Sequence, residues 1–158
     1  MLRKAEQKDI ARIAEIIVFT KRVTYRDIFK NDYVSFNVIQ VLSEAKRLEL
    51  PNKLDNMYVY DDDGIIKAVI TADISKDNIF LSDFYVEPCF QNLGIGKYIT
   101  NIFIKQAKQE KKRLLLGVLD KNTAAVKFYE KVGFKYSGTK NEYENSGFYI
   151  LQYEFAGL

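Results

Sequence analysis

The sequence predicts an α/β fold in which helices cover a central sheet, and two observations predict it. Apolar residues change their spacing along the chain, from the three-to-four spacing of helices to the alternating or continuous runs of strands. The resulting element order is β-α-α-β-β-β-α-β-α-β-β, and helices interspersed with strands in this way cover the faces of a sheet. Two of the strands, 78–86 and 114–119, are almost wholly apolar, as expected in the middle of a covered sheet.

The first third of the chain predicts a short strand and two helices. Residues 2–5 are expected to form an edge strand, and Asp9 suits the positive end of the helix that follows. Residues 20–31 are expected to be a looser, aromatic-rich segment, and Pro51 ends the second helical region. The first helical face comprises Ile10, Ile13, Ala14, Ile17 and Val18, and the second comprises Val34, Val38, Val41, Leu42 and Ala45.

A hairpin and a third strand follow. The runs 57–60 and 65–72 flank a turn, 61–64, that ends in Asp-Gly, a strong hairpin signal. The third strand, 78–86, is apolar on both faces apart from Ser82 and Asp83.

The remaining elements alternate between helix and strand. A glycine-containing loop, 91–96, opens a helix, and the strand 114–119 and the helix 122–132 follow. The last two strands, 134–137 and 148–155, are expected on either side of a polar connection, 138–147. The expected buried stripes are Ile95, Ile99, Ile102, Phe103 and Ala107 in one helix, and Ala124, Ala125, Phe128 and Val132 in the other.

Composition predicts one globular domain, residues 1–158, and excludes several classes of site. The chain has no histidine and a single cysteine, which excludes histidine-dependent nucleophilic triads and an intrachain disulfide and argues against a metal site. Proton transfer must therefore use Tyr, Asp, Glu, Lys, Cys or water. The net charge of +3 comes from dispersed residues, so we expect no nucleic-acid partner.

No apolar run approaches the ~20 residues of a membrane span. The first nine residues are charged and lack the apolar stretch of a secretory signal. We therefore expect a cytoplasmic protein with no membrane partner.

The most informative stretch, residues 84–97, runs from a buried strand through a loop with two glycines into a helix. Gly94 and Gly96 allow a ligand to approach the backbone, and a helix start favours phosphate. A dinucleotide fingerprint would need glycine where Ile99 stands, and a Walker loop would need Ser or Thr where Tyr98 stands. A tight turn that caps a helix is the alternative reading of the two glycines.

Two blocks of this sequence resemble the GCN5-related N-acetyltransferase (GNAT) family. The first is Val86-x-Pro88-x-x-Gln91-x-x-Gly94-x-Gly96, and the second is Asn122-x-x-Ala125-x-x-Phe128-Tyr129-x-Lys131-x-Gly133-Phe134. The resemblance implies a mixed, mostly antiparallel sheet of about seven strands flanked by about four helices. It also implies transfer of an acetyl group from acetyl-CoA to a primary amine, on a small molecule or a protein, with a homodimer as a possible assembly. The alternative is a GNAT-fold module that binds acyl-CoA without catalysis.

The resemblance also assigns a cofactor-binding set. The strand end 84–86 would pair with the pantetheine arm, the amide near Val86 would donate to the thioester carbonyl, and residues 92–97 would hold the pyrophosphate. Asn122 would contact the pantetheine arm, and it is also a good helix N-cap; the two roles are compatible. The whole set is Phe84, Tyr85, Val86, Gln91, Asn92, Leu93, Gly94, Ile95, Gly96, Lys97 and Asn122.

Tyr129 resembles the family's general acid, which protonates the departing thiolate of coenzyme A. A phenol suits this task because its ordinary pKa is close to that of a thiol. The alternative is a tyrosine packed in the core. We favour the catalytic role because Phe128 already falls on the predicted buried stripe of the helix, and Tyr129 lies about 100° away from it.

The base is less well defined by the resemblance. Many relatives place a glutamate five positions before the asparagine, where this chain has Gly117. Asp83 is the first replacement, because burial in an apolar strand would raise its pKa. The alternatives are an Asp83 paired structurally with Lys or Arg, Glu87 as the base, and a chain of water molecules.

Aromatic residues before the first hairpin are candidates for the acceptor pocket. By resemblance to the family, Tyr25, Phe29 and Tyr33 would shape the site of the amine. Packing of these rings against the sheet is the alternative.

Overall fold

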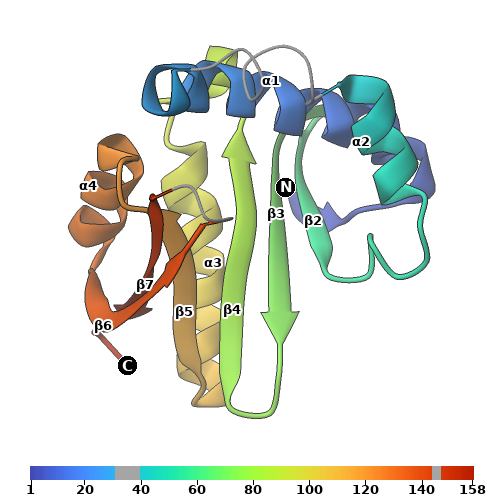
Figure 1. Ribbon diagram of the computed structural model, residues 1–158. Helices are drawn as coiled ribbons and strands as arrows, with labels where there is room; N and C mark the ends of the chain where they lie inside the picture. Colours follow the sequence, from blue (N-terminus) through green and yellow to red (C-terminus); the bar gives the residue numbers. More distant parts are fainter. Residues whose placement is uncertain (31–39, 144–146) are drawn as a thin grey trace. The chain divides into compact units, whose positions relative to one another are not determined.

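The computed structural model describes residues 1–30, 40–143 and 147–158 (Figure 1). Its elements follow the predicted order and form a seven-stranded sheet in the order β1-β2-β3-β4-β5-β7-β6. Strand β4 pairs with β5 in parallel, whereas β1/β2, β2/β3, β5/β7 and β6/β7 are antiparallel. The strands are β1 Leu2–Lys4, β2 Met57–Asp62, β3 Ile65–Ile74, β4 Asn78–Val86, β5 Arg113–Leu119, β6 Phe134–Glu142 and β7 Tyr149–Phe155.

Four α-helices flank this mixed sheet, which confirms the predicted α/β class. They are α1 Ile10–Phe29, α2 Val41–Leu48, α3 Ile95–Glu110 and α4 Thr123–Val132, with short 3-10 helices at Gln7–Asp9 and Pro88–Phe90. The contacts divide the chain into two compact units. The first comprises Met1–Ala72 and Asp83–Ile99, and the second comprises Asp73–Ser82 and Thr100–Leu158.

The core of the first unit is the apolar face of α1 packed with β2, β3 and α2. Ile13 and Ala14 are completely buried, as the helical spacing predicts. The helix is longer than predicted, because residues 20–29 continue it instead of forming a looser segment. That segment contains no glycine or proline to break the helix, which ends where Lys30 adopts a left-handed φ of 50° and donates its amide to Arg26.

Helix α2 buries a different face from the predicted one. Val41 and Leu42 are 40% and 67% exposed, whereas Leu48 is buried against the α1 core and Ala45 packs partly against it. Val34 and Val38 lie outside the described residues. The prediction that Val41 and Leu42 are buried is therefore wrong, because packing against α1 determines which face of α2 is buried.

A buried carboxylate ties the N-terminal strand to α1. Asp9 is 4% exposed, and its Oδ2 and Oδ1 accept hydrogen bonds from Arg3 Nη1 and Nη2 at 2.7 and 3.0 Å. Its Oδ2 also accepts the amide of Glu6 at 2.8 Å. Arg3 Nε donates in turn to Asp61 Oδ2 of β2 at 2.9 Å. The hydrogen bond with Arg3 chiefly holds the pKa of Asp9 below its usual range.

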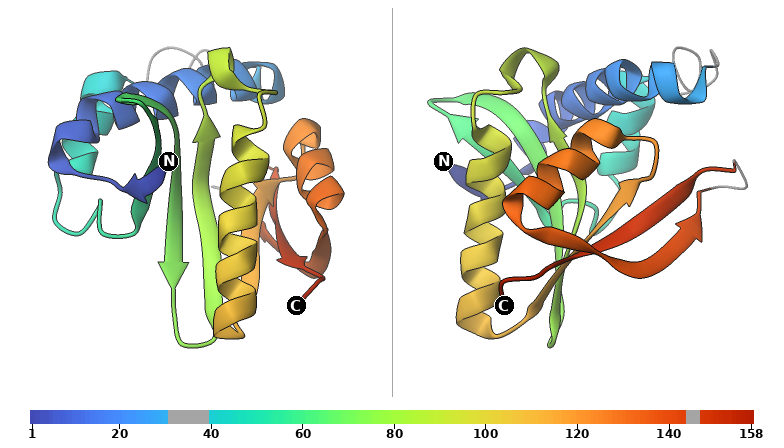
Figure 2. Two further views of the ribbon diagram at one scale, coloured as in Figure 1. Left: turned by 180° about the vertical axis from the view of Figure 1, so that it is seen from behind. Right: turned by 90° about the vertical axis from the view of Figure 1, so that its left-hand side faces the viewer.

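The second unit packs the body of α3 and α4 against β5, β7 and β6 (Figure 2). Phe103 and Ala107 of α3 and Leu114 and Leu116 of β5 are almost completely buried, as their spacing predicts. Strand β6 is longer than predicted, because it continues to Glu142 after a register shift between Tyr136 and Lys140. A bulge of this kind lets pairing resume beyond a break in the ladder.

Two absences hold for the part of the chain that the structure describes. No helix there is both long and apolar enough to span a membrane. No group of three or more His, Cys, Asp or Glu side chains is placed to hold a metal ion there.

We predict that Asp9→Asn lowers the free energy of unfolding by about 2 kcal/mol, because Arg3 would lose a charged hydrogen-bond partner. The folded pKa of Asp9 is depressed, so its stabilisation is fully present above the ordinary value of 3.8 and is lost as pH falls through the folded pKa. Urea denaturation between pH 7 and pH 2 measures both effects. Asp27→Asn, at an 83% exposed side chain, is the matched control and should change stability by less than about 0.5 kcal/mol. An equal loss in both variants would contradict the prediction.

Candidate functional site

The glycine loop joins the end of β4 to the start of α3 in the first unit. Residues 91–94 are exposed, and two of them have left-handed backbones, Asn92 with a φ of 62° and Gly94 with a φ of 85°. Gln91 Nε2 donates to the carbonyl of Val86 at 2.9 Å, which fastens the loop to the strand end. The loop is therefore a fixed turn with one exposed side.

Helix α3 begins at this loop with its first turn at the surface. The amide of Tyr98 donates to the carbonyl of Gly94 at 2.9 Å, so the backbone groups of 94–97 form the first turn. This end of a helix carries the positive end of the dipole, and exposed Lys97 adds a charge. A Cβ atom built on Gly94 would have no heavy atom within 4 Å, so the space over the loop is open to a ligand. These features fit a pyrophosphate group.

The end of β4 is fixed on its β3 side. The amide of Glu87 donates to the carbonyl of Lys67 at 3.0 Å, and Tyr85 packs partly against the core of the first unit. The parallel register of β4 with β5 covers Asn78 to Leu81. Residues 84–86, predicted to meet the pantetheine arm, are half-buried.

Asp83, the predicted base, stands at an irregular position of β4. Its φ is 45°, in the left-handed region that side chains other than glycine rarely adopt. It is half-buried, and its negative charge is one cause of the raised pKa of Arg47, after the hydrogen bond from Arg47 to Glu44. Arg47 is therefore the arginine that the alternative, a structural pairing of Asp83, requires.

Glu87, the second candidate base, has its carboxylate engaged. It forms an ion pair with Arg12 Nη2, while Arg12 Nε donates to the carbonyl of Ile66 at 3.1 Å and Nη1 donates to Glu15 at 2.6 Å. Arg12 thus links α1, β3 and the residue after β4. This network gives Glu87 a structural role.

Asn122 and Tyr129 belong to the second unit. Asn122 is the N-cap of α4, and its Oδ1 accepts the amide of Ala125 at 3.3 Å, so the capping role is confirmed. Tyr129 is 9% exposed, and its ring makes edge-to-face contacts with Phe128 and Phe134 at centroid distances of 5.2 and 5.8 Å. The predicted stripe is wrong here, because Tyr129 is more buried than Phe128 and Ala124 is exposed. The catalytic role of Tyr129 stays a prediction.

The structure adds a feature at Gly117 that the sequence alone does not reveal. A Cβ atom at this position would lie 2.9 Å from Cγ2 of Ile150 and 3.7 Å from Cζ of Phe80. The place of the relatives' glutamate is therefore filled by two apolar side chains. The sequence shows that the carboxylate is absent, but only the pairing of β5 with β7 brings Ile150 to the vacated position.

Tyr25 and Phe29, predicted to face the acceptor, lie in the last turns of α1. Their rings meet edge to face, with centroids 5.8 Å apart and an interplanar angle of 84°. Both are half-buried, and their acceptor role stays a prediction. Tyr33 lies outside the described residues.

Comparisons with known proteins identify the family and show similar folds. Residues 26–156 match the family model described as acetyltransferase (GNAT) domain. The fold is similar to that of PaiA N-acetyltransferase from Thermoplasma acidophilum in complex with coenzyme A, with a TM-score of 0.76, 20% identity and 96% of each chain covered. It is also similar to yncA from Salmonella typhimurium with acetyl-CoA, with a TM-score of 0.65, 18% identity and 98% and 91% of the two chains covered.

One relative was found by sequence in Bacillus subtilis strain 168. It is a spermine/spermidine N(1)-acetyltransferase, 23% identical over 103 residues, which are 61% of this chain and 68% of the relative.

We predict that Gly117→Ala costs about 1–3 kcal/mol of stability, because the new methyl group collides with Ile150. In an Ile150→Ala background the same change should cost less, since the colliding group is gone. A double-mutant cycle by urea denaturation measures this coupling. Additive costs in the two backgrounds would show that Ile150 does not fill the site.

Proposed function

This chain belongs to the GNAT acetyltransferase family, and we propose that it is an N-acetyltransferase that uses acetyl-CoA to acetylate a primary amine. One observation carries the proposal, the geometry of the loop 91–97. Gly94 has a left-handed backbone with open space beside it, the helix start is exposed, and Lys97 is exposed. The same loop carries the first GNAT block of the sequence.

Each proposed cofactor-binding residue is described within its own unit. In the first unit, residues 92–97 would hold the pyrophosphate through backbone amides and Lys97, and the strand end 84–86 would meet the pantetheine arm. In the second unit, the helix cap uses only Oδ1 of Asn122, so its side-chain nitrogen Nδ2 can still donate to a ligand, and Asn122 stays a proposed cofactor-binding residue. When bound, acetyl-CoA supplies an acetyl thioester for attack by the amine.

Tyr129 is our proposed general acid. Its Oη would hold the proton that the leaving thiolate takes up, and the contacts with Phe128 and Phe134 fix the ring. Burial of the ring excludes water from its sides. Asp83 is the proposed base, because it is half-buried in β4 directly before the strand end 84–86 that would meet the pantetheine arm.

A second candidate function is a module that binds acyl-CoA without turnover. The observation that favours it is the apolar filling at Gly117, because that position holds the base of many relatives. Substitution of Tyr129 separates the two candidates, since a module has no turnover to lose.

The acceptor to test first is a polyamine. The Bacillus subtilis relative named for spermine and spermidine supports this choice. Other small amines and protein amines complete the screen, with release of free thiol as the measurement.

We predict that Gly94→Ala weakens acetyl-CoA binding by about tenfold or more, because its Cβ would enter the space reserved for the pyrophosphate. Gly64→Ala is a matched control, because Gly64 and Gly94 have φ values of 86° and 85° and neither Cβ would meet an atom within 4 Å. Both variants should lose about 1 kcal/mol of stability from the strained backbone, and only Gly94→Ala should lose affinity. Isothermal titration with acetyl-CoA, beside NADH and ATP, measures the binding. Failure of the folded protein to bind acetyl-CoA at millimolar concentration would refute the proposed function.

We predict that Tyr129→Phe lowers kcat by about 10²–10⁴-fold and leaves acetyl-CoA affinity nearly unchanged, because only the transferable proton is removed. Tyr153→Phe is the control, because Tyr153 is also buried in the second unit and loses a hydrogen bond to Glu130. It should lose stability and keep turnover. Equal loss of kcat in both variants would indicate that Tyr129 acts through packing.

A further inference from the structure

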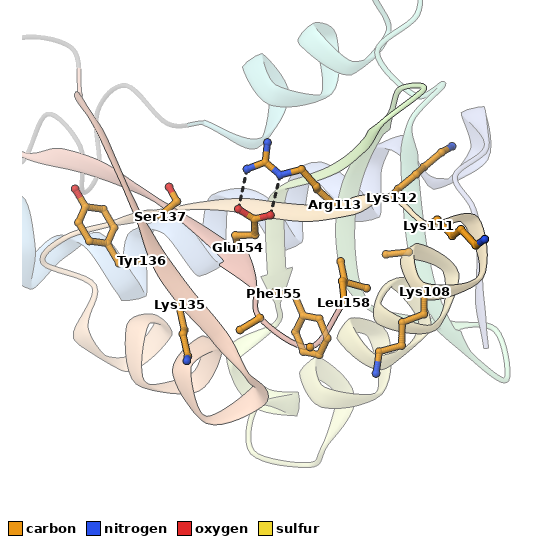
Figure 3. Close-up of a pocket in the computed structure, with 13 residues that line it drawn as sticks. Lys108, Lys111, Lys112, Arg113, Lys135, Tyr136, Ser137, Glu154, Phe155 and Leu158 are labelled. Atoms are coloured by element: carbon orange, nitrogen blue, oxygen red, sulfur yellow. Dashed lines mark hydrogen bonds and ion pairs between the residues drawn. The ribbon is translucent and has the colours of Figure 1, made fainter.

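A second site for an anion lies in the second unit, at the C-terminal end of α3. The structure has an open pocket of about 760 Å³ there (Figure 3). The last turn of α3, the start of β5, the start of β6 and the end of β7 form its walls. It is lined by Ala107, Lys108, Lys111, Lys112, Arg113, Lys135, Tyr136, Ser137, Glu154, Phe155, Ala156, Gly157 and Leu158.

The side chains that line this pocket carry an excess of positive charge. Arg113 is bound by Glu154, with Nε and Nη2 donating to its two carboxylate oxygens at 2.8 and 2.7 Å. Lys112 pairs with Glu110 at 2.7 Å. Lys108, Lys111 and Lys135 form no ion pair within the described residues. Three of the lysines that line the pocket therefore have no carboxylate partner in the described part of the chain.

The end of a helix accounts for only part of this charge. The C-terminus of a helix carries the equivalent of roughly half a negative charge, which Lys108 and Lys111 complement. Lys135 belongs to β6, so its charge is not explained by the dipole of α3. Figure 3 shows Lys108 and Lys135 on either side of Phe155, so the cations reach the pocket from two separate elements.

The floor of the pocket is apolar and packed. Gly157 lies so close to Phe155 that a Cβ there would come within 2.9 Å of the ring, and Lys108 Nζ lies 5.5 Å from the ring centroid. Phe155 is half-buried and Leu158 is 52% exposed, so the pocket offers apolar surface for the organic part of a phosphate ligand. The volume falls within the ~300–1,000 Å³ range of small-molecule sites.

We propose that this pocket binds a small organic phosphate, independently of the acetyl-CoA loop. No residue of 84–97 lines the pocket, so the two sites use different side chains. Lysine is a common phosphate ligand, acting as a mobile point charge. The compact charge and the modest net charge of +3 favour a small ligand over a nucleic acid.

The test is a titration of ¹⁵N-labelled full-length protein with AMP, followed by NMR. Adenosine and inorganic phosphate are the probes that lack one half of the ligand. The variant is Lys108→Gln/Lys135→Gln. The control with the same net charge is Lys76→Gln/Lys127→Gln, two exposed lysines of the same unit outside the pocket.

The expected result is saturable shifts of amides at 107–113, 135–137 and 154–157. The Kd should rise by about tenfold in Lys108→Gln/Lys135→Gln and stay unchanged in the control, because two unpaired cations are lost. Shifts confined to 92–97, equal weakening in both variants, or no saturation would overturn the proposal. Inorganic phosphate or adenosine binding as tightly as AMP would also overturn it. Because the shifted amides show which site binds AMP, failure of this proposal can be distinguished from failure of the protein to bind acetyl-CoA.

Discussion

Burial of one face of α3 is the constraint on which both proposed ligand sites depend. Ile99, Phe103 and Ala107 are at most 1% exposed, and burial of such side chains contributes on the order of 1.5–3 kcal/mol for each of the larger two. This stripe fixes the rotation of the helix. The first turn can then present backbone groups and Lys97 at the glycine loop, while the last turn contributes Lys108, and the residue after the helix contributes Lys111, to the basic pocket.

The candidate acid and the candidate bases have different neighbouring side chains. Tyr129 makes edge-to-face contacts with Phe128 and Phe134, which hold its ring in place. Carboxylates near β4 have arginine neighbours instead: Glu87 is ion-paired with Arg12, and Asp83 lies in the field of Arg47. At Gly117, apolar side chains fill the place of a base. The mechanism that we propose must therefore place its base somewhere other than position 117.

The sequence predicts the elements better than it predicts which helix faces are buried. Glycine and proline end segments by local steric rules, so the hairpin turn at Gly64 and the end of α4 at Gly133 are predicted correctly. The faces of α2 and α4 depend on what packs against them, and there Val41, Leu42 and Phe128 were assigned too much burial. The extension of α1 to Phe29 is a similar case, because aromatic content does not by itself interrupt a helix.

The element order, the glycine loop and the resemblance to GNAT proteins can be predicted from the sequence, because they depend on local spacing and on residue types at fixed positions. In contrast, the contact of Ile150 with the space at Gly117 and the ion pair of Arg12 with Glu87 become visible only in the folded chain. The same holds for the basic pocket, where Lys135 of β6 joins Lys108 of α3. Each of these contacts joins residues distant in sequence, and strand register and helix packing bring such residues together.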